Sequence, residues 1–123
     1  MAHILLIEDE EAVRTMLRDM LEHFGHTVIE ARHGKEGLAL FQPATVDLVV
    51  TDIVMPEMDG FEVMRELQRM HAPVKILAIS GAEPDPTAGY LHMAKLMGAT
   101  AVLAKPFSLG AVRAAINELL PHV

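Results

Sequence analysis

Five short runs of mostly aliphatic residues recur along the chain of 123 residues, and longer amphipathic stretches separate them. Four of the five runs show no alternation of polar and apolar residues, which is typical of strands buried on both faces of a parallel sheet. The pattern predicts strands at His3–Ile7, Thr27–Ala31, Leu48–Asp52, Lys75–Ser80 and Ala101–Ala104.

Helical patterns occupy the intervals between these strands. From Glu10 to Phe24 the apolar residues recur at steps of three and four, which places them on one face of a helix. Further helices are predicted at Gly34–Phe41 and Gly60–Met70, and Ser108 is a suitable N-cap for a last helix. Strand–helix alternation repeated five times predicts an α/β sandwich with a mostly parallel sheet.

The length and composition fit one globular domain, which we assign to residues 1–123. Asp and Glu number 17 against 10 Lys and Arg, and the formal charge of −7 argues against a nucleic-acid-binding surface. The chain contains no Cys, which excludes disulfides and Cys-ligated metal sites. It has no signal-peptide pattern and no apolar run near the ~20 residues that span a bilayer, so we expect a cytoplasmic protein without membrane contact.

Charged and hydroxyl-bearing residues stand at the carboxyl ends of four predicted strands: Glu8 and Asp9, Asp52, Ser80 and Lys105. Because ligands of open parallel sheets bind beyond these ends, we expect the five side chains in one crevice. Two carboxylates ~5 Å apart repel by roughly 3 kcal/mol at an effective dielectric of ~20, so three of them require a cation. Mg²⁺ prefers carboxylate and phosphate oxygens, and a carboxylate can be the nucleophile in phosphoryl transfer. The crevice therefore predicts magnesium and a phosphoryl group.

Four segments of the chain resemble the CheY-like receiver domains of bacterial two-component response regulators. In order along the chain they are Leu5–Glu10, Asp52–Gly60, Ala78–Gly81 and Lys105–Phe107. With the five β/α units they cover essentially the whole chain. The resemblance implies a flavodoxin-like (βα)5 three-layer sandwich, with a five-stranded parallel sheet of order 2-1-3-4-5. It also implies a single receiver domain without an output domain.

The resemblance assigns the acidic residues. Asp52 aligns with the phosphoacceptor, and Glu8 and Asp9 align with the pair that holds Mg²⁺, Asp9 directly and Glu8 partly through water. Asp52 and the backbone carbonyl of Val54 align with further metal ligands. The next two acids, Glu10–Glu11, we assign instead to the dipole of the helix that begins there.

The remaining site residues also follow from the resemblance. Ser80 aligns with the switch hydroxyl and Lys105 with the phosphate-binding lysine. In this family the peptide bond at the position of Lys105-Pro106 is usually cis, and we expect the same here.

The resemblance further implies partners. A sensor histidine kinase or a histidine phosphotransfer protein would phosphorylate Asp52, and the domain would control a downstream protein through its fourth helix, fifth strand and fifth helix. We expect a monomer or a weak phosphorylation-dependent dimer. Such a domain catalyses its own phosphorylation and dephosphorylation and turns over no separate substrate, so we do not expect an enzyme.

Three features depart from the commonest receiver sequences. Ser80 stands where Thr is more frequent, which keeps the hydroxyl. Val102 stands where Tyr or Phe is frequent, so we assign the switch to movement around Ser80, with Tyr90 as a candidate participant. The stretch after Ser80 is a few residues longer than usual and contains Pro84 and Pro86, which either tune partner choice or are a tolerated insertion.

The residues that flank the crevice predict a long-lived phosphoryl group. Val54 and Ala82 carry neither acid nor amide, so their side chains cannot position a hydrolytic water. We expect slower loss of the phosphoryl group than in receivers with polar residues at both positions.

Other functions compete with the switch. A magnesium-dependent phosphatase of the haloacid dehalogenase type also uses Asp, Ser or Thr, and Lys, but it needs a second Asp where Val54 stands. A pseudo-receiver that only binds a partner is disfavoured by the intact set of site residues. A flavin-binding protein is disfavoured because no phosphate-binding loop follows the first strand.

Overall fold

The computed structural model describes residues 1–70, 73–81 and 89–120. Five strands alternate with five helices along the chain. The order is β1 (His3–Ile7), α1 (Glu11–His23), β2 (Thr27–Ala31), α2 (Gly34–Leu40), β3 (Leu48–Asp52), α3 (Gly60–Arg69), β4 (Lys75–Ser80), α4 (Tyr90–Leu96), β5 (Ala101–Ala104) and α5 (Leu109–Leu119).

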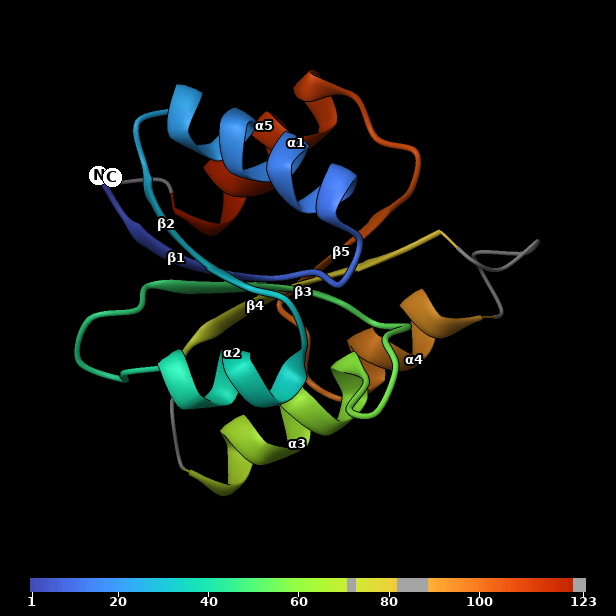
Figure 1. Ribbon diagram of the computed structural model, residues 1–123. Coiled ribbons are helices and arrows are strands. Elements are labelled where there is room, and N and C mark those ends of the chain that lie inside the picture. The colour runs from blue at the N-terminus through green and yellow to red at the C-terminus, as the bar shows by residue number, and fades with distance from the viewer. Residues whose placement is uncertain (71–72, 82–88, 121–123) are drawn as a thin grey trace.

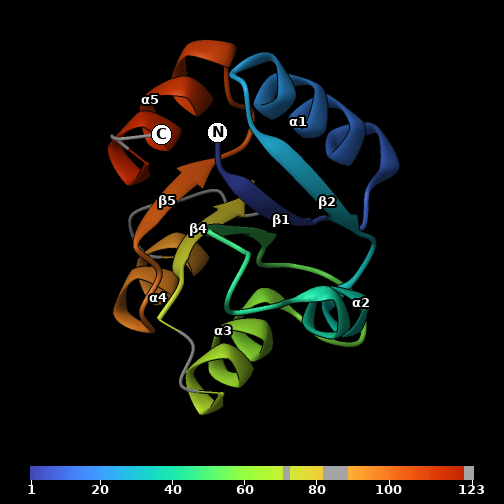
Figure 2. The same cartoon turned by 90° about the vertical axis from the view of Figure 1, so that its left-hand side faces the viewer.

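All five strands form one parallel sheet of order β2-β1-β3-β4-β5 (Figure 2). The bounds of each strand coincide with those predicted from the apolar runs. The central register pairs Leu5 with Val49, and Val49 with Ile76. The predicted α/β class and the strand order implied by the resemblance are both confirmed.

The helices cover the sheet on both faces. Helices α1 and α5 lie on one face, and α2, α3 and α4 lie on the other (Figures 1 and 2). Two apolar cores result, one beneath each helical layer. Successive residues of the central strands point alternately into one core and the other. For example, Leu5 and Val49 belong to the core under α2 and α3, whereas Leu6 and Val50 belong to the core under α1 and α5.

Burial differs between the central and the edge strands. From Ile4 onward β1 is buried throughout, as is all of β3, and β4 is buried after its first residue. The edge strands β2 and β5 are mostly half-buried. The prediction of strands buried on both faces is thus correct for the three central strands. The edge strands are more exposed, because each has a neighbouring strand on one side only.

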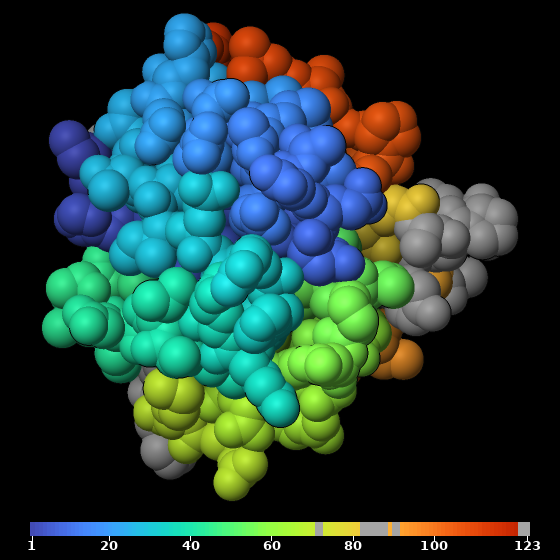
Figure 3. Space-filling view, in the orientation of Figure 1, coloured from blue at the N-terminus to red at the C-terminus, as the bar shows by residue number. Residues whose placement is uncertain are grey.

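Local signals determine where several helices begin and end. The Ser108 hydroxyl accepts a hydrogen bond from the N–H of Ala111 at 3.0 Å, which confirms the predicted N-cap of α5. Gly25 follows α1 with a φ of 96°, a conformation that favours glycine. The ends of α1 lie one residue inside the prediction, because Glu10 and Phe24 are its caps. The space-filling view shows α1 above α2 and α3 on one continuous face (Figure 3).

Candidate functional site

The topology brings four strand ends together at one edge of the sheet. Ile7 of β1 pairs with Thr51 of β3, Asp52 pairs with Ile79 of β4, and Ser80 pairs with Ala104 of β5. The next residue of each strand therefore projects from the same carboxyl edge. This register is the reason that residues predicted from separate strand ends lie in one place.

Lys105 is the centre of the resulting charge cluster. Its Nζ lies 3.0 Å from Oδ2 of Asp52 and 3.1 Å from Oε1 of Glu8. Both carboxylates are buried, since Glu8 is 1% and Asp52 6% exposed. Ser80, 1% exposed, lies at the end of the neighbouring strand. One ammonium group thus forms ion pairs with two buried carboxylates.

The acidic cluster has room and chemistry for a cation. One carboxylate oxygen from each of Glu8, Asp9 and Asp52 lies within 4.8 Å of the other two. Oε1 of Glu8 is buried and lies 3.1 Å from Lys105 Nζ, an ammonium group that Glu8 shares with Asp52. A buried oxygen of this kind costs free energy unless a further positive group faces it. An all-oxygen set with unused acceptor capacity fits a hard divalent ion such as Mg²⁺.

The electrostatics of the cluster shift two pKa values. Burial raises the pKa of Glu8 to about 7, and the charge of Asp52 adds to this rise, while the N–H of Glu10 and the Lys105 ammonium oppose it. Burial alone lowers the pKa of Lys105, but its hydrogen bond to Asp52 and the charges of Asp52 and Glu8 raise it above the ordinary value. Lys105 therefore stays charged, while burial disfavours the charged form of Glu8.

A pocket of about 250 Å³ opens beside the cluster. It is lined by Glu10, Asp52, Val54, Ser80, Gly81 and Lys105. Val54 is 46% exposed and lines the wall of this pocket, as expected for a residue that flanks the crevice. Ala82, also predicted to flank it, lies outside the described residues, as do Pro84 and Pro86, and nothing is described of the Tyr90 side chain.

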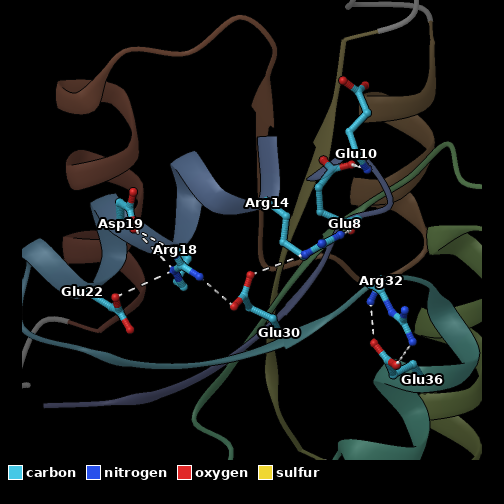
Figure 4. Close-up of polar contacts among 9 residues, drawn as sticks. All are labelled: Glu8, Glu10, Arg14, Arg18, Asp19, Glu22, Glu30, Arg32 and Glu36. Atoms are coloured by element: carbon cyan, nitrogen blue, oxygen red, sulfur yellow. Dashed lines mark hydrogen bonds and ion pairs between the residues drawn. The ribbon is translucent and has the colours of Figure 1, made fainter. Parts of the chain in front are cut away.

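Glu10 lies at the N-terminus of α1, where we predicted that it interacts with the helix dipole. It is the N-cap of α1, but its side chain makes no capping hydrogen bond. Its backbone N–H donates to Oε2 of Glu8 at 3.0 Å, while its own carboxylate points away from Glu8 (Figure 4) and the residue lines the pocket. Glu11 lies in the first turn of α1 as expected for an acid that interacts with the helix dipole.

Two glycines permit close approaches at the site. A Cβ on Gly81 would lie 2.3 Å from Cβ of Lys105, so the absence of a side chain lets the lysine stem pass. A Cβ on Gly60 would lie 2.6 Å from the carbonyl oxygen of Asp52, and the Gly60 N–H donates to the carbonyl of Ile53 at 2.8 Å. Gly60 thus holds the start of α3 against the end of β3. The sequence motifs contained both glycines, but only the structure shows what each one contacts.

The comparison with known families agrees with this geometry. The sequence model described as "Response regulator receiver domain" matches residues 4–117. The chain belongs to this family.

Relatives and solved structures place the receiver domain in context. Sensor kinase CckA of Brucella abortus (strain 2308) is 40% identical over 121 residues, which cover 97% of this chain and 12% of the kinase. Transcriptional regulatory protein GlrR of Escherichia coli (strain K12) is 36% identical over 97% of this chain and 26% of its own length. The chain thus spans a minor part of these curated relatives.

Two solved structures cover nearly all of the receiver domain. A response regulator receiver domain protein from Clostridium thermocellum superposes with a TM-score of 0.89 at 28% identity, over 98% of this chain and 95% of that one. Chemotaxis protein CheY4 of Vibrio cholerae gives a TM-score of 0.85 at 30% identity, over 98% and 99%. Both confirm the flavodoxin-like architecture.

Several family features are present in this receiver domain. The Lys105-Pro106 peptide bond is cis, as the resemblance implies. Receiver domains are signalling modules that bind Mg²⁺ at an acidic pocket, and Glu8, Asp9 and Asp52 form such a cluster here. In the described part of the chain, none of the helices is both long enough and apolar enough to cross a bilayer.

Proposed function

We propose that this receiver domain accepts a phosphoryl group on Asp52 and thereby switches a surface that controls a protein partner. The observation that carries the proposal is the placement of Asp52: its Oδ2 lies 3.0 Å from Lys105 Nζ, in a pocket lined also by Ser80 and beside the acidic cluster. The donor is a sensor histidine kinase or a histidine phosphotransfer protein.

The transfer makes one bond and breaks one bond. A carboxylate oxygen of Asp52 attacks phosphorus, the O–P bond of an aspartyl phosphate forms, and the P–N bond of the donor phosphohistidine breaks, with the electron pair leaving on nitrogen. Lys105 stays protonated and pairs with a phosphoryl oxygen, and the Ser80 hydroxyl donates to another. Both residues already line the pocket in which the phosphoryl group would lie.

The acidic residues hold the metal that the transfer needs. Asp9 and Asp52 would be the direct carboxylate ligands, Glu8 would act partly through water, and the backbone carbonyl of Val54 would complete the protein ligands. When bound, Mg²⁺ neutralises developing charge on the transferring phosphoryl oxygens. The two buried carboxylates Glu8 and Asp52 share the Lys105 ammonium, which supports a further cation at this place.

An apolar hollow next to the pocket supports a protein as the donor. It has a volume of about 350 Å³ and is lined by Val13, Met16, Gly81, Lys105, Pro106 and Phe107. It shares Gly81 and Lys105 with the acceptor pocket, so a protein side chain seated in the hollow would lie beside the reacting group. Met16, on α1, is 40% exposed and available for such a contact.

The output surface lies on α4, β5 and α5. The phosphoryl group adds about −1.5 to −2 charge, by analogy with other phosphorylated residues, and draws Ser80 and Lys105 toward it. Both residues lie on or directly after the two strands next to α4 and α5, so their movement changes that face. Met93 and Leu96 of α4 are 49% and 71% exposed and offer apolar contacts to a partner. Val102 on β5 is half-buried and has no aromatic ring to reorient.

Val54 gives the phosphoryl group a long lifetime. Its exposed aliphatic side chain stands at the pocket wall and cannot orient a water molecule. In a Val54→Asn variant the amide can do so, and the phosphoryl group should be lost faster than from wild type. Slower loss from the Asn variant, followed by mass spectrometry after donor removal, would overturn this part of the proposal.

The decisive experiment is intact-protein mass spectrometry after exposure to a small acyl-phosphate donor, with and without Mg²⁺. One phosphoryl adduct is expected, dependent on Mg²⁺, absent from Asp52→Ala and retained in the surface control Glu11→Ala. No adduct from the small donor or from a phosphorylated histidine domain would contradict the proposal and favour a pseudo-receiver.

A further inference from the structure

Arg14 connects the acidic pair to strand β2. Its side chain, only 13% exposed, extends from α1 to the backbone of Glu8, directly after β1. Nη1 donates to the backbone carbonyl of Glu8 at 2.9 Å, and Nε lies 3.4 Å from Oε1 of Glu30 (Figure 4). No sequence motif pointed to Arg14.

The contact with Glu8 acts on the backbone between two acids of the cluster, Glu8 and Asp9. The carbonyl that Arg14 binds belongs to the peptide group joining Glu8 to Asp9. On the other side of Glu8, its N–H donates to the carbonyl of Ala31 at 3.1 Å. Its Oε2 accepts from the N–H of Glu10 at 3.0 Å. Arg14 therefore fixes the plane of the peptide that joins the two residues whose carboxylates lie with Asp52 in the acidic cluster.

Glu30 holds Arg14 in this position. Its two oxygens face two different cations, Oε1 the Nε of Arg14 and Oε2 the Nη1 of Arg18 at 3.1 Å. Arg18 is 34% exposed and also pairs with Asp19 at 3.1 Å, so it belongs to the surface of α1 (Figure 4). Glu30 is thus the shared acid that orients Arg14 and offsets its positive charge near the pocket.

We propose that the Arg14–Glu30 pair is a positioning element that sets the Mg²⁺ affinity of the acidic pocket. Arg14 touches neither the phosphoryl group nor the metal; it acts through the Glu8–Asp9 peptide. The inference rests on the proposed function, because it concerns the metal that the transfer to Asp52 would use. Groups that orient metal ligands in this way typically change metal affinity by about tenfold or more when removed.

The sign of the effect separates positioning from simple electrostatics. Removing a positive charge near an acidic pocket makes the pocket more negative, so charge alone predicts tighter binding of Mg²⁺ after loss of Arg14. Loss of the hydrogen bond to Glu8 instead frees the peptide and predicts weaker binding. Arg14→Met removes both the charge and the donor but keeps an unbranched stem of similar packing. Arg18→Met removes a charge from the same helix without touching Glu8.

The test is a calorimetric titration of the full chain with MgCl₂, with no phosphodonor present. Arg14→Met is expected to bind Mg²⁺ about tenfold more weakly than wild type, and Arg18→Met within about twofold of it. Glu30→Gln is expected to weaken binding as well, because Arg14 loses its anchor and its charge is no longer offset. Arg14→Lys keeps the charge but has one nitrogen for two acceptors, and should fall between wild type and Arg14→Met.

Each outcome decides a different claim. Equal or tighter Mg²⁺ binding by folded Arg14→Met overturns the positioning role while leaving the proposed function intact. If circular dichroism shows that Arg14→Met is unfolded, Glu30→Gln and Arg14→Lys carry the test, and wild-type affinity in both overturns the inference. Absence of Mg²⁺ binding by wild type, together with absence of an adduct on Asp52, overturns the proposed function instead.

Discussion

Strand β3 joins two regions of opposite chemistry. Leu48, Val49 and Val50 are at most 1% exposed in the apolar cores, whereas Asp52 at the carboxyl end is nearly as buried, at 6%, but carries a charge beside Lys105. Burial of aliphatic surface stabilises the fold by about 25 cal/mol per Å², while burial of a carboxylate costs free energy unless it is paired. The middle of the sheet therefore stabilises the fold, whereas its polar edge carries the residues for the proposed chemistry. Substitutions in the two regions should have separable effects on stability and on phosphorylation.

The largest effect is expected at the polar edge. Asp52→Asn should abolish the phosphoryl adduct completely, because the amide is not a nucleophile for phosphorus. Its free energy of unfolding should stay within about 1 kcal/mol of wild type, since loss of the ion pair with Lys105 is offset by relief of repulsion from Glu8. Mass spectrometry and urea unfolding measure the two quantities, and an adduct at the wild-type level would exclude Asp52 as the acceptor.

The converse change is Leu48→Ala on the same strand. Removing a fully buried leucine should lower the free energy of unfolding by about 3 kcal/mol through lost burial and a residual cavity. The folded fraction should still form the adduct on Asp52. Leu96→Ala is the matched control, because Leu96 is 71% exposed and its loss should change stability by no more than about 0.5 kcal/mol. Equal destabilisation by both substitutions would contradict the assignment of Leu48 to the core.

The separation of the two regions also determines what the sequence could predict. Apolar runs report burial directly, so the bounds of β3 and β1 follow from residue type. The convergence of Glu8, Asp52, Ser80 and Lys105 follows from topology, because the carboxyl ends of parallel strands share one edge.

The contacts behind this edge could not be predicted in the same way. Whether Arg14 reaches the carbonyl of Glu8 depends on the rotation of α1 about its axis relative to β2, and an arginine on a helix has many acidic neighbours in the sequence. The passage of the Lys105 stem over Gly81 depends on the close approach of two chain segments 24 residues apart in the sequence. Such contacts are results of packing, which a periodic pattern does not encode.

A smaller effect is expected from pH. Burial raises the pKa of Glu8 to about 7 from an ordinary value of 4.5, so between these values the folded metal-free protein binds a proton that the unfolded chain has released. Stability falls with rising pH wherever the folded state binds more protons. The contribution of Glu8 is therefore fully present below pH 4.5 and is lost as the pH approaches 7, with a magnitude of roughly 1 to 3 kcal/mol.

Urea unfolding in the presence of a chelator measures this loss between roughly pH 5 and pH 7.5, the window given by the raised pKa of Glu8. The control is Glu8→Gln. Other carboxylates titrate in both proteins, so the difference between wild type and Glu8→Gln isolates Glu8. Addition of Mg²⁺ should restore stability at the higher pH, because the ion binds the charged form. An identical pH dependence in the two proteins would show that Glu8 is not protonated in the folded state near neutrality.

The smallest effect is expected in the loop that follows β3 at the polar edge. Glu57 is exposed and has a φ of 67°, a conformation that costs an L-residue about 1 to 2 kcal/mol and glycine almost nothing. Because glycine also loses about 0.5 to 1 kcal/mol more conformational entropy on folding, Glu57→Gly should raise the free energy of unfolding by only about 0.5 kcal/mol. The same substitution in the interior of α3, Glu66→Gly, should lower it by about 1 kcal/mol. Urea unfolding of both variants gives opposite signs if backbone strain at Glu57 is real, and a loss of stability in both would show that it is not.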